Sequence, residues 1–196
     1  MTLRNITCAV TLCLLTLSGQ AVGKTEVPPY KNKSLSIEKR VDDLMGRMTL
    51  REKVLQLQNR GAGRLDEIDR IFNGESFGCT HEMGTTAAEC ATMYKELQQY
   101  MLTKTRLGIP IITSAEGIQG ILQNNCTLFP HALAQGSTFN PALIQRMTEA
   151  AGEEAKVIGI HQILSPVLDI ARELRWGRVE ETFGEDPYLI SEMGIA

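Results

Sequence analysis

Residues 172–189 read Arg-Glu-Leu-Arg-Trp-Gly-Arg-Val-Glu-Glu-Thr-Phe-Gly-Glu-Asp-Pro-Tyr-Leu. This stretch holds three arginines, five carboxylates and the only tryptophan of the chain. It follows the apolar run Ile-Leu-Ser-Pro-Val-Leu at residues 163–168, which predicts a buried strand. α/β barrels place their ligand sites just past the ends of such strands. We therefore expect residues 172–189 to border a ligand site.

Composition places the chain among ordinary globular proteins. Of its 196 residues, 43% are hydrophobic and 22% are charged, which are typical values for this class. The net charge of −3 and the lack of a Lys/Arg-rich run argue against a nucleic-acid partner. No phosphate-binding glycine motif is present, which argues against a nucleotide site.

The N-terminus has the pattern of a secretory signal peptide over residues 1–23. Arg4 precedes a mostly apolar, uncharged stretch at residues 6–17, and small residues follow at 18–23. A short membrane anchor is the alternative, but the apolar stretch is shorter than a membrane span requires. We expect a secreted or periplasmic protein that leaves the membrane after signal cleavage.

Three cysteines, Cys79, Cys90 and Cys126, lie in the predicted mature part. An odd number leaves at least one thiol without a disulfide partner. A Cys79–Cys90 bridge and three buried free thiols both remain open. The cysteine spacings and the scattered histidines predict no metal site.

Apolar periodicity divides the chain after the signal peptide into an exposed leader at residues 24–35 and a folded part at residues 36–196. Alternating strands and amphipathic helices indicate an α/β fold with a parallel sheet, and the wide strand spacing favours a barrel over a compact doubly wound sheet. The expected helices are at 36–48 with Val41, Leu44 and Met48 inside, at 49 to the glycines of 61–63 with Val54, Leu55 and Leu57 inside, at 65–72, at 86–105 with Ala87, Cys90, Tyr94, Leu97 and Met101 inside, and at 140–158. The expected strands are at 77–81, 108–113 and 163–168.

A second polar cluster follows the strand expected at residues 108–113. Glu116 lies three residues beyond that strand, and Gly117 and Gly120 allow a sharp turn close to a ligand. A carboxylate there can accept hydrogen bonds from ligand hydroxyls, or it can be a solvent-facing loop acid.

The arginines Arg172, Arg175 and Arg178 have the same two interpretations. Their planar forks of donors suit carboxylates and vicinal hydroxyls, but the neighbouring acids can also hold them in a salt-bridged loop. Trp176 can stack on a sugar or plug the loop. His131, after Phe-Pro, has no partner placed by spacing and is interpreted as a structural loop histidine.

Several motifs together resemble glycoside hydrolase family 3. Residues 172–187 resemble the signature that follows the central barrel strand of that family, and residues 127–143 are similar to its Phe-Pro loop and the next helix. Residues 41–56 are similar to its opening helices, and residues 106–110 and 116–120 also match. The resemblance covers residues 36–196 and implies the incomplete N-terminal part of a (β/α)8 TIM-type barrel.

The resemblance implies an exported, exo-acting, retaining β-glycosidase. It would hydrolyse β-linked glucosides or xylosides at non-reducing ends, with no metal or other cofactor. It maps the sugar-binding acid onto Glu116 and the sugar-binding arginine onto Arg178, with Arg172 as the second candidate. Two positions depart from the family: Gln119 replaces a histidine, and Glu173-Leu174 replace Asp-Pro.

The resemblance also implies that the nucleophile and the acid/base lie beyond residue 196. The sequence is therefore interpreted as a truncated fragment without hydrolase activity of its own. One alternative is a non-catalytic glycan-binding module that keeps the sugar-binding residues. Another is an enzyme that uses Glu116 with Glu181 as its carboxylate pair. The sugar, the linkage and the oligomeric state stay open.

Overall fold

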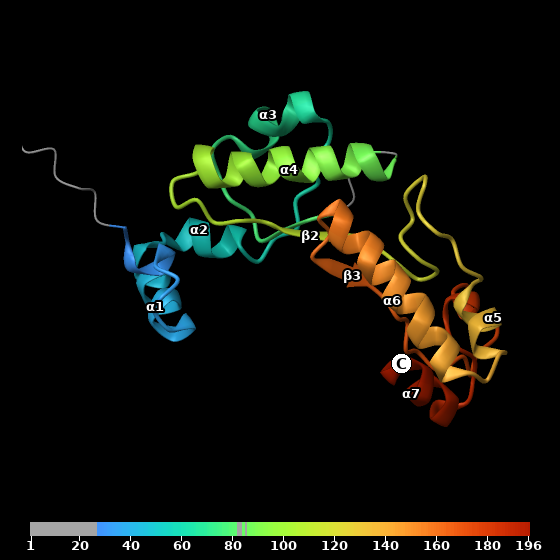
Figure 1. Cartoon of the computed structure of the whole chain (residues 1–196). Coiled ribbons are helices and arrows are strands. Elements are labelled where there is room, and N and C mark those ends of the chain that lie inside the picture. The colour runs from blue at the N-terminus through green and yellow to red at the C-terminus, as the bar shows by residue number, and fades with distance from the viewer. Residues whose placement is uncertain (1–26, 82–83, 85) are drawn as a thin grey trace, which may run out of the picture. The chain divides into compact units, whose positions relative to one another are not determined.

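The computed structural model describes residues 27–81, 84 and 86–196 (Figure 1). The predicted signal peptide therefore lies outside the described residues. The chain divides into two compact units, which meet between Gly46 and Arg47. Among the described residues, the first unit contains a 3-10 helix, η1 (Pro29–Lys31), and most of helix α1 (Ile37–Arg47).

In the first unit, two hydrogen bonds tie the leader to α1. The Tyr30 N–H donates to Asp43 Oδ2 at 3.1 Å, and Arg40 Nε donates to the Tyr30 carbonyl oxygen at 3.0 Å. Helix α1 begins directly after Ser36, as predicted. Of the predicted inner face, Met48 is buried just after the helix, but the prediction is wrong within α1, because none of the helix residues is buried and Val41 is 48% exposed.

The second unit is built on three parallel strands in the order β1-β2-β3, which confirms the predicted α/β class. Its elements are α2 (Leu50–Leu55), η2 (Leu65–Glu67), α3 (Ile68–Phe72), β1 (Cys79–Thr80), α4 (Ala87–Lys104), β2 (Ile112–Glu116), α5 (Ala132–Gly136), α6 (Pro141–Ile158), β3 (Gln162–Leu164), η3 (Val179–Glu181) and α7 (Pro187–Ile195).

Local capping signals place the start of α2 and both ends of α6 as predicted. The Thr49–Glu52 capping box opens α2. Asn140 accepts a hydrogen bond from the N–H of Leu143 at the start of α6, where Pro141 occupies the first turn. Gly159 ends α6 in the left-handed region, with a φ of 92°.

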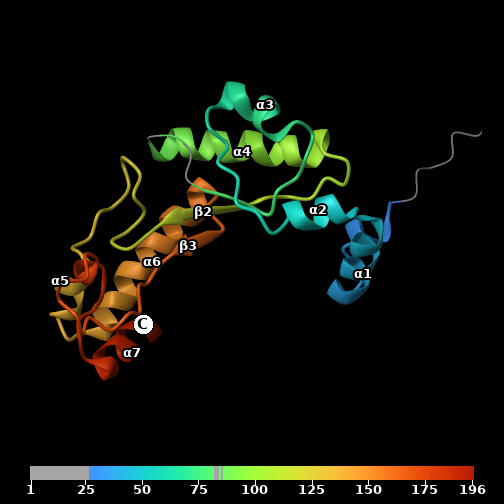
Figure 2. The same cartoon turned by 180° about the vertical axis from the view of Figure 1, so that it is seen from behind.

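Helix α4 supplies one face of the larger core. Its side chains at helical spacing are buried as predicted, and Cys90, Leu97 and Met101 have no exposed surface. Figures 1 and 2 show α3 alongside α4, and the Tyr100 hydroxyl bonds Asp69 across that contact at 3.1 Å. All three cysteines after residue 78 are free thiols, so the structure contains no Cys79–Cys90 bridge.

A second, smaller core gathers at the N-terminal end of α6. There α5 and α7 lie beside α6 in both views (Figures 1 and 2). The buried side chains of this group include Ile144 of α6, Phe183, and Ile190 and Met193 of α7. This core fixes the chain that follows β3, including residues 172–189.

The sequence misplaced the end of α2 and both ends of β2. Helix α2 stops at Leu55, well before the glycines at 61–63, and Val54 and Leu57 are exposed. Strand β2 starts at Ile112, because the Gln98 side chain bonds both the N–H and the carbonyl oxygen of Ile111. Those two backbone groups therefore have no role in the ladder. Glu116 is consequently the last residue of β2 and does not lie in a loop beyond it.

The predicted strand at residues 163–168 is also shorter than expected. Strand β3 ends at Leu164, before Pro166, which has no N–H to donate to a ladder. The prediction that this strand is buried is wrong, because Leu164 is 40% exposed and Leu168 is 51% exposed. Over the described residues, no helix is long and apolar enough to span a membrane.

Replacing Gly78 by alanine should destabilise the fold, because a Cβ there would overlap the Gln56 main chain. We expect the free energy of unfolding to fall by about 1–3 kcal/mol, the usual cost of overpacking. Gly152 of α6 is a matched control, since a Cβ there meets nothing within 4 Å. Gly152→Ala should raise the free energy by about 0.5–1 kcal/mol through helix propensity. Urea denaturation measures both, and equal effects would contradict this packing.

The ion pair between Glu52 and Arg106 should make stability depend on acid pH. The Arg106 hydrogen bonds, with Nη2 to Glu52 Oε2 at 2.6 Å, lower the pKa of Glu52 from 4.5 to about 2. A lowered pKa in the folded state stabilises the fold above pH 4.5, and this contribution is lost as the pH falls toward 2. Denaturation between these pH values should show a shallower decline for Glu52→Gln than for the wild type. The exposed Glu96 serves as the control, and an equal change in Glu96→Gln would contradict the assignment.

Candidate functional site

The candidate site begins at the carboxyl end of β2. Parallel pairing puts Glu116 beside Leu164 of β3 and Thr113 beside Thr80 of β1, so all three strands end at one edge of the sheet. The Glu116 side chain is 39% exposed there, and His81 Nε2 lies 3.8 Å from its Oε1. The carboxylate can therefore meet a ligand at this edge.

Arg178 lies just before η3 and forms an ion pair with Glu181 on that helix. Its Nε is 3.0 Å from Glu181 Oε1, and its Nη2 is 2.6 Å from Glu181 Oε2. The Arg178 side chain is nevertheless 59% exposed, so this ion pair does not seal it inside the protein. It retains donor surface for a ligand.

The electrostatics place Arg178 in the field of Glu116. The Glu181 hydrogen bonds raise the pKa of Arg178 most, and the charges of Glu181, Asp169 and Glu116 raise it further. Two residues predicted from distant parts of the sequence therefore act on one edge of the molecule. Asp169, which follows the end of β3, joins them.

Glu181 is held in its ionised form. The Arg178 hydrogen bonds lower the pKa of Glu181, and the charges of Arg178 and His131 lower it as well. His131, which the sequence interpreted as a structural residue, precedes α5 and contributes charge to this group. A carboxylate with a lowered pKa is a poor proton donor at neutral pH.

The other two arginines behave differently. Arg175 pairs with Glu173 only two residues away, at 2.7 Å, and both side chains are mostly exposed. That hydrogen bond lowers the pKa of Glu173 to about 2. Arg172 is exposed and makes no ion pair with any residue of the described ranges. Of these arginines, Arg178 is the one whose pKa is raised by the charge of Glu116.

The turn after Glu116 packs on the Phe-Pro loop. The Phe129 N–H donates to the Gln119 carbonyl oxygen at 2.8 Å. The Gln119 side-chain Oε1 is buried and has no hydrogen-bond partner among the residues described. The Gln119 backbone, and not its side chain, therefore joins the turn to the Phe-Pro loop.

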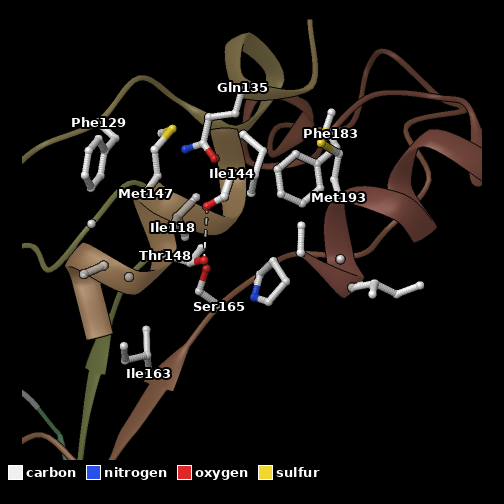
Figure 3. A pocket seen from close by; sticks show the side chains of 17 residues that line it. Ile118, Phe129, Gln135, Ile144, Met147, Thr148, Ile163, Ser165, Phe183 and Met193 are labelled. Atoms are coloured by element: carbon white, nitrogen blue, oxygen red, sulfur yellow. Dashed lines mark hydrogen bonds between the residues drawn. The ribbon is translucent and has the colours of Figure 1, made fainter. Parts of the chain in front are cut away.

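A cavity of about 260 Å³ lies on the other side of this turn, between the strand ends and helices α6 and α7. Figure 3 shows its labelled lining, which is mostly apolar, with Ile118, Ile144, Met147, Phe183 and Met193 facing the space. The polar exceptions include Thr148, whose hydroxyl donates to the Ile144 carbonyl oxygen at 3.1 Å. The cavity contains none of the charged residues named above, so it is distinct from the charged group around Glu116.

Sequence reasoning missed His81 and Asp169 as members of the site. The available signal was position, since each follows a strand of the parallel sheet. His81 comes one residue after β1, but the strand assignment at residues 77–81 was too loose to show this. The sequence indicates Asp169 only as one of the acids near the three arginines.

Comparison with known proteins gives a consistent result. Residues 49–196 match the model of the glycosyl hydrolase family 3 N-terminal domain. A putative β-xylosidase of Formosa agariphila is 35% identical over 87% of this chain and 24% of its own length. A periplasmic β-glucosidase/β-xylosidase of Dickeya chrysanthemi is 31% identical over 84% of this chain and 28% of its own length.

Solved structures agree with the sequence relatives. The crystal structure of a β-glucosidase from Listeria innocua superposes with a TM-score of 0.67 and 31% identity, over 82% of this chain and 23% of that one. The chain thus spans about a quarter of the length of these relatives. The family match covers most of the chain and includes Glu116 and all three arginines of residues 172–189. The chain therefore belongs to glycosyl hydrolase family 3, through that family's N-terminal domain.

Proposed function

We propose that this chain binds the terminal sugar of a β-linked glucoside or xyloside, as the N-terminal part of a (β/α)8 barrel over residues 36–196. The observation that carries the proposal is that Glu116, at the end of β2, and Arg178 both expose their side chains, by 39% and 59%, and that the charge of Glu116 raises the pKa of Arg178. The names of the relatives, which include β-xylosidase and β-glucosidase, support the same substrate class.

The two side chains have complementary roles in this proposal. The Glu116 carboxylate accepts hydrogen bonds from sugar hydroxyls, and the Arg178 fork donates to them. Arg172, which is exposed nearby in the sequence, is the secondary donor. Such contacts orient the sugar ring and contribute to transition-state binding without making or breaking bonds.

The proposed reaction of the whole enzyme is exo-acting hydrolysis with retention. Such a reaction needs one ionised carboxylate as nucleophile and one protonated carboxyl group as acid. Glu181 is unsuited to the acid role, because the hydrogen bonds from Arg178 lower its pKa. We therefore assign Glu116, Arg178 and Arg172 to sugar binding, with Glu181 as the support of Arg178, and assign no catalytic residue, metal or cofactor within residues 27–196.

Export is part of the same proposal. Residues 1–23 are proposed as a cleaved signal peptide and residues 24–35 as a leader, which would deliver a secreted or periplasmic protein. The signal-like pattern of the N-terminus and the periplasmic relative in Dickeya chrysanthemi support this location.

The first test is hydrolysis by the chain itself. Incubated with 4-nitrophenyl β-glucoside and β-xyloside, the 196-residue chain should release nitrophenol no faster than buffer. The reason is the ion-paired state of Glu181, which removes the only acid that the sequence offered as a partner for Glu116. Turnover above the buffer rate that disappears in Glu181→Gln would instead support the Glu116–Glu181 pair.

The second test is sugar binding. NMR titration of the chain with glucose and with xylose should give saturable shifts, and Arg178→Ala should weaken the affinity roughly tenfold or more through the loss of charged hydrogen bonds. Arg175→Ala removes a guanidinium of a more exposed side chain that pairs only locally, so it should leave the affinity within about twofold. Equal losses in the two variants, or no binding of either sugar by the wild type, would contradict the proposed function.

A further inference from the structure

We propose that His81 is a positioning residue for the Glu116 carboxylate and holds it in the orientation that receives a sugar. The inference rests on the proposed function for the role of Glu116, but the contact itself is independent of any sugar. It is carried by a chain of side chains that runs from β1 to the end of β2.

The sheet register brings the two residues together. Thr80 pairs with Thr113 in the parallel ladder, so His81 comes next to Ser114. His81 Nδ1 lies 3.3 Å from Ser114 Oγ, and His81 Nε2 lies 3.8 Å from Glu116 Oε1. The imidazole therefore bridges a buried hydroxyl and the half-exposed carboxylate two residues further along β2.

Ser114 is a fixed anchor for this bridge. It is only 1% exposed, and its hydroxyl donates to the Thr80 carbonyl oxygen at 2.9 Å. The Cys79 Sγ lies 3.4 Å from the Ser114 hydroxyl oxygen. Because the hydroxyl proton is used on Thr80, the Ser114 oxygen is left to accept a hydrogen bond from His81 Nδ1.

That arrangement determines how the imidazole acts on Glu116. With Nδ1 donating to Ser114, the ring plane is fixed and Nε2 is the atom turned toward the carboxylate. The separation of 3.8 Å is longer than a hydrogen bond but short enough for an ion pair. The ring therefore attracts the Glu116 carboxylate through Nε2 when the ring carries a second proton.

His161 is a matched control on the other side of β2. Its Nδ1 lies 2.6 Å from the Thr113 hydroxyl, so it repeats the imidazole–hydroxyl contact between neighbouring strands. It forms no ion pair with Glu116. Replacing His161 perturbs the sheet in a similar way without touching the carboxylate.

The direct test uses the full chain without sugar. The imidazole ¹⁵N and ¹H signals of His81 are recorded in the wild type and in Glu116→Gln, which keeps the side-chain shape and removes the charge. The His81 Nε2 signal should move, and the His161 signals should stay. Glu149→Gln, at an exposed position on α6, is the control for the same chemical change elsewhere. An unchanged His81 signal in Glu116→Gln would overturn the inference.

The second arm measures the consequence for binding. His81→Gln should weaken glucose or xylose binding roughly three- to tenfold, whereas His161→Gln should not, because only the first removes the contact with Glu116. Equal losses in the two variants would show that His81 acts only through sheet stability and would overturn the positioning role. If the wild type binds neither sugar while the His81 signal responds to Glu116→Gln, the proposed function fails but the His81–Glu116 coupling stands.

Discussion

The arrangement of the second unit depends on β2, which pairs in parallel with a strand on each side. Parallel pairing sends the carboxyl ends of β1, β2 and β3 to one edge, so the residues that end these strands become neighbours. Glu116 and His81 come from separate parts of the sequence and meet for this reason. Hydroxyl groups on β2 strengthen the same constraint, since Ser114 bonds β1 and Thr113 bonds the Gly159 carbonyl oxygen at 2.6 Å.

The loop after β3 sorts its three arginines by the distance to their acid partners. Arg175 pairs with Glu173, two residues away, so its hydrogen-bond donors are used within the loop. Arg178 is paired three residues ahead, with Glu181 on η3, and the second core fixes that segment through Phe183. The pairing holds the Arg178 fork in place while leaving more than half of it exposed, as a binding residue requires. Glu181 is thereby a support for the arginine, which is a different role from that of a catalytic acid.

The sequence predicted best what is decided locally. The Thr49 and Asn140 caps and the inner face of α4 depend on residues within one or two turns, and all were located correctly. Strand limits were wrong where distant side chains intervene, as Gln98 does at Ile111. In the candidate site, Glu116 and Arg178 are predicted through their motifs. His81 was missed because its meaning depends on the register between β1 and β2, which no local pattern encodes.

The exposure of the side chains along β3 follows from the position of this strand at the edge of the sheet. Strands of a parallel sheet in a barrel are covered on both faces, by side chains inside and by helices outside. Strand β2 meets this condition, with Thr113, Ser114 and Ala115 all buried, whereas Leu164 of β3 and the nearby Leu168 remain open to solvent. An apolar strand with one neighbouring strand is stable only when its open side is covered. The edge position of β3 therefore explains why an apolar sequence that reads as buried is here half exposed.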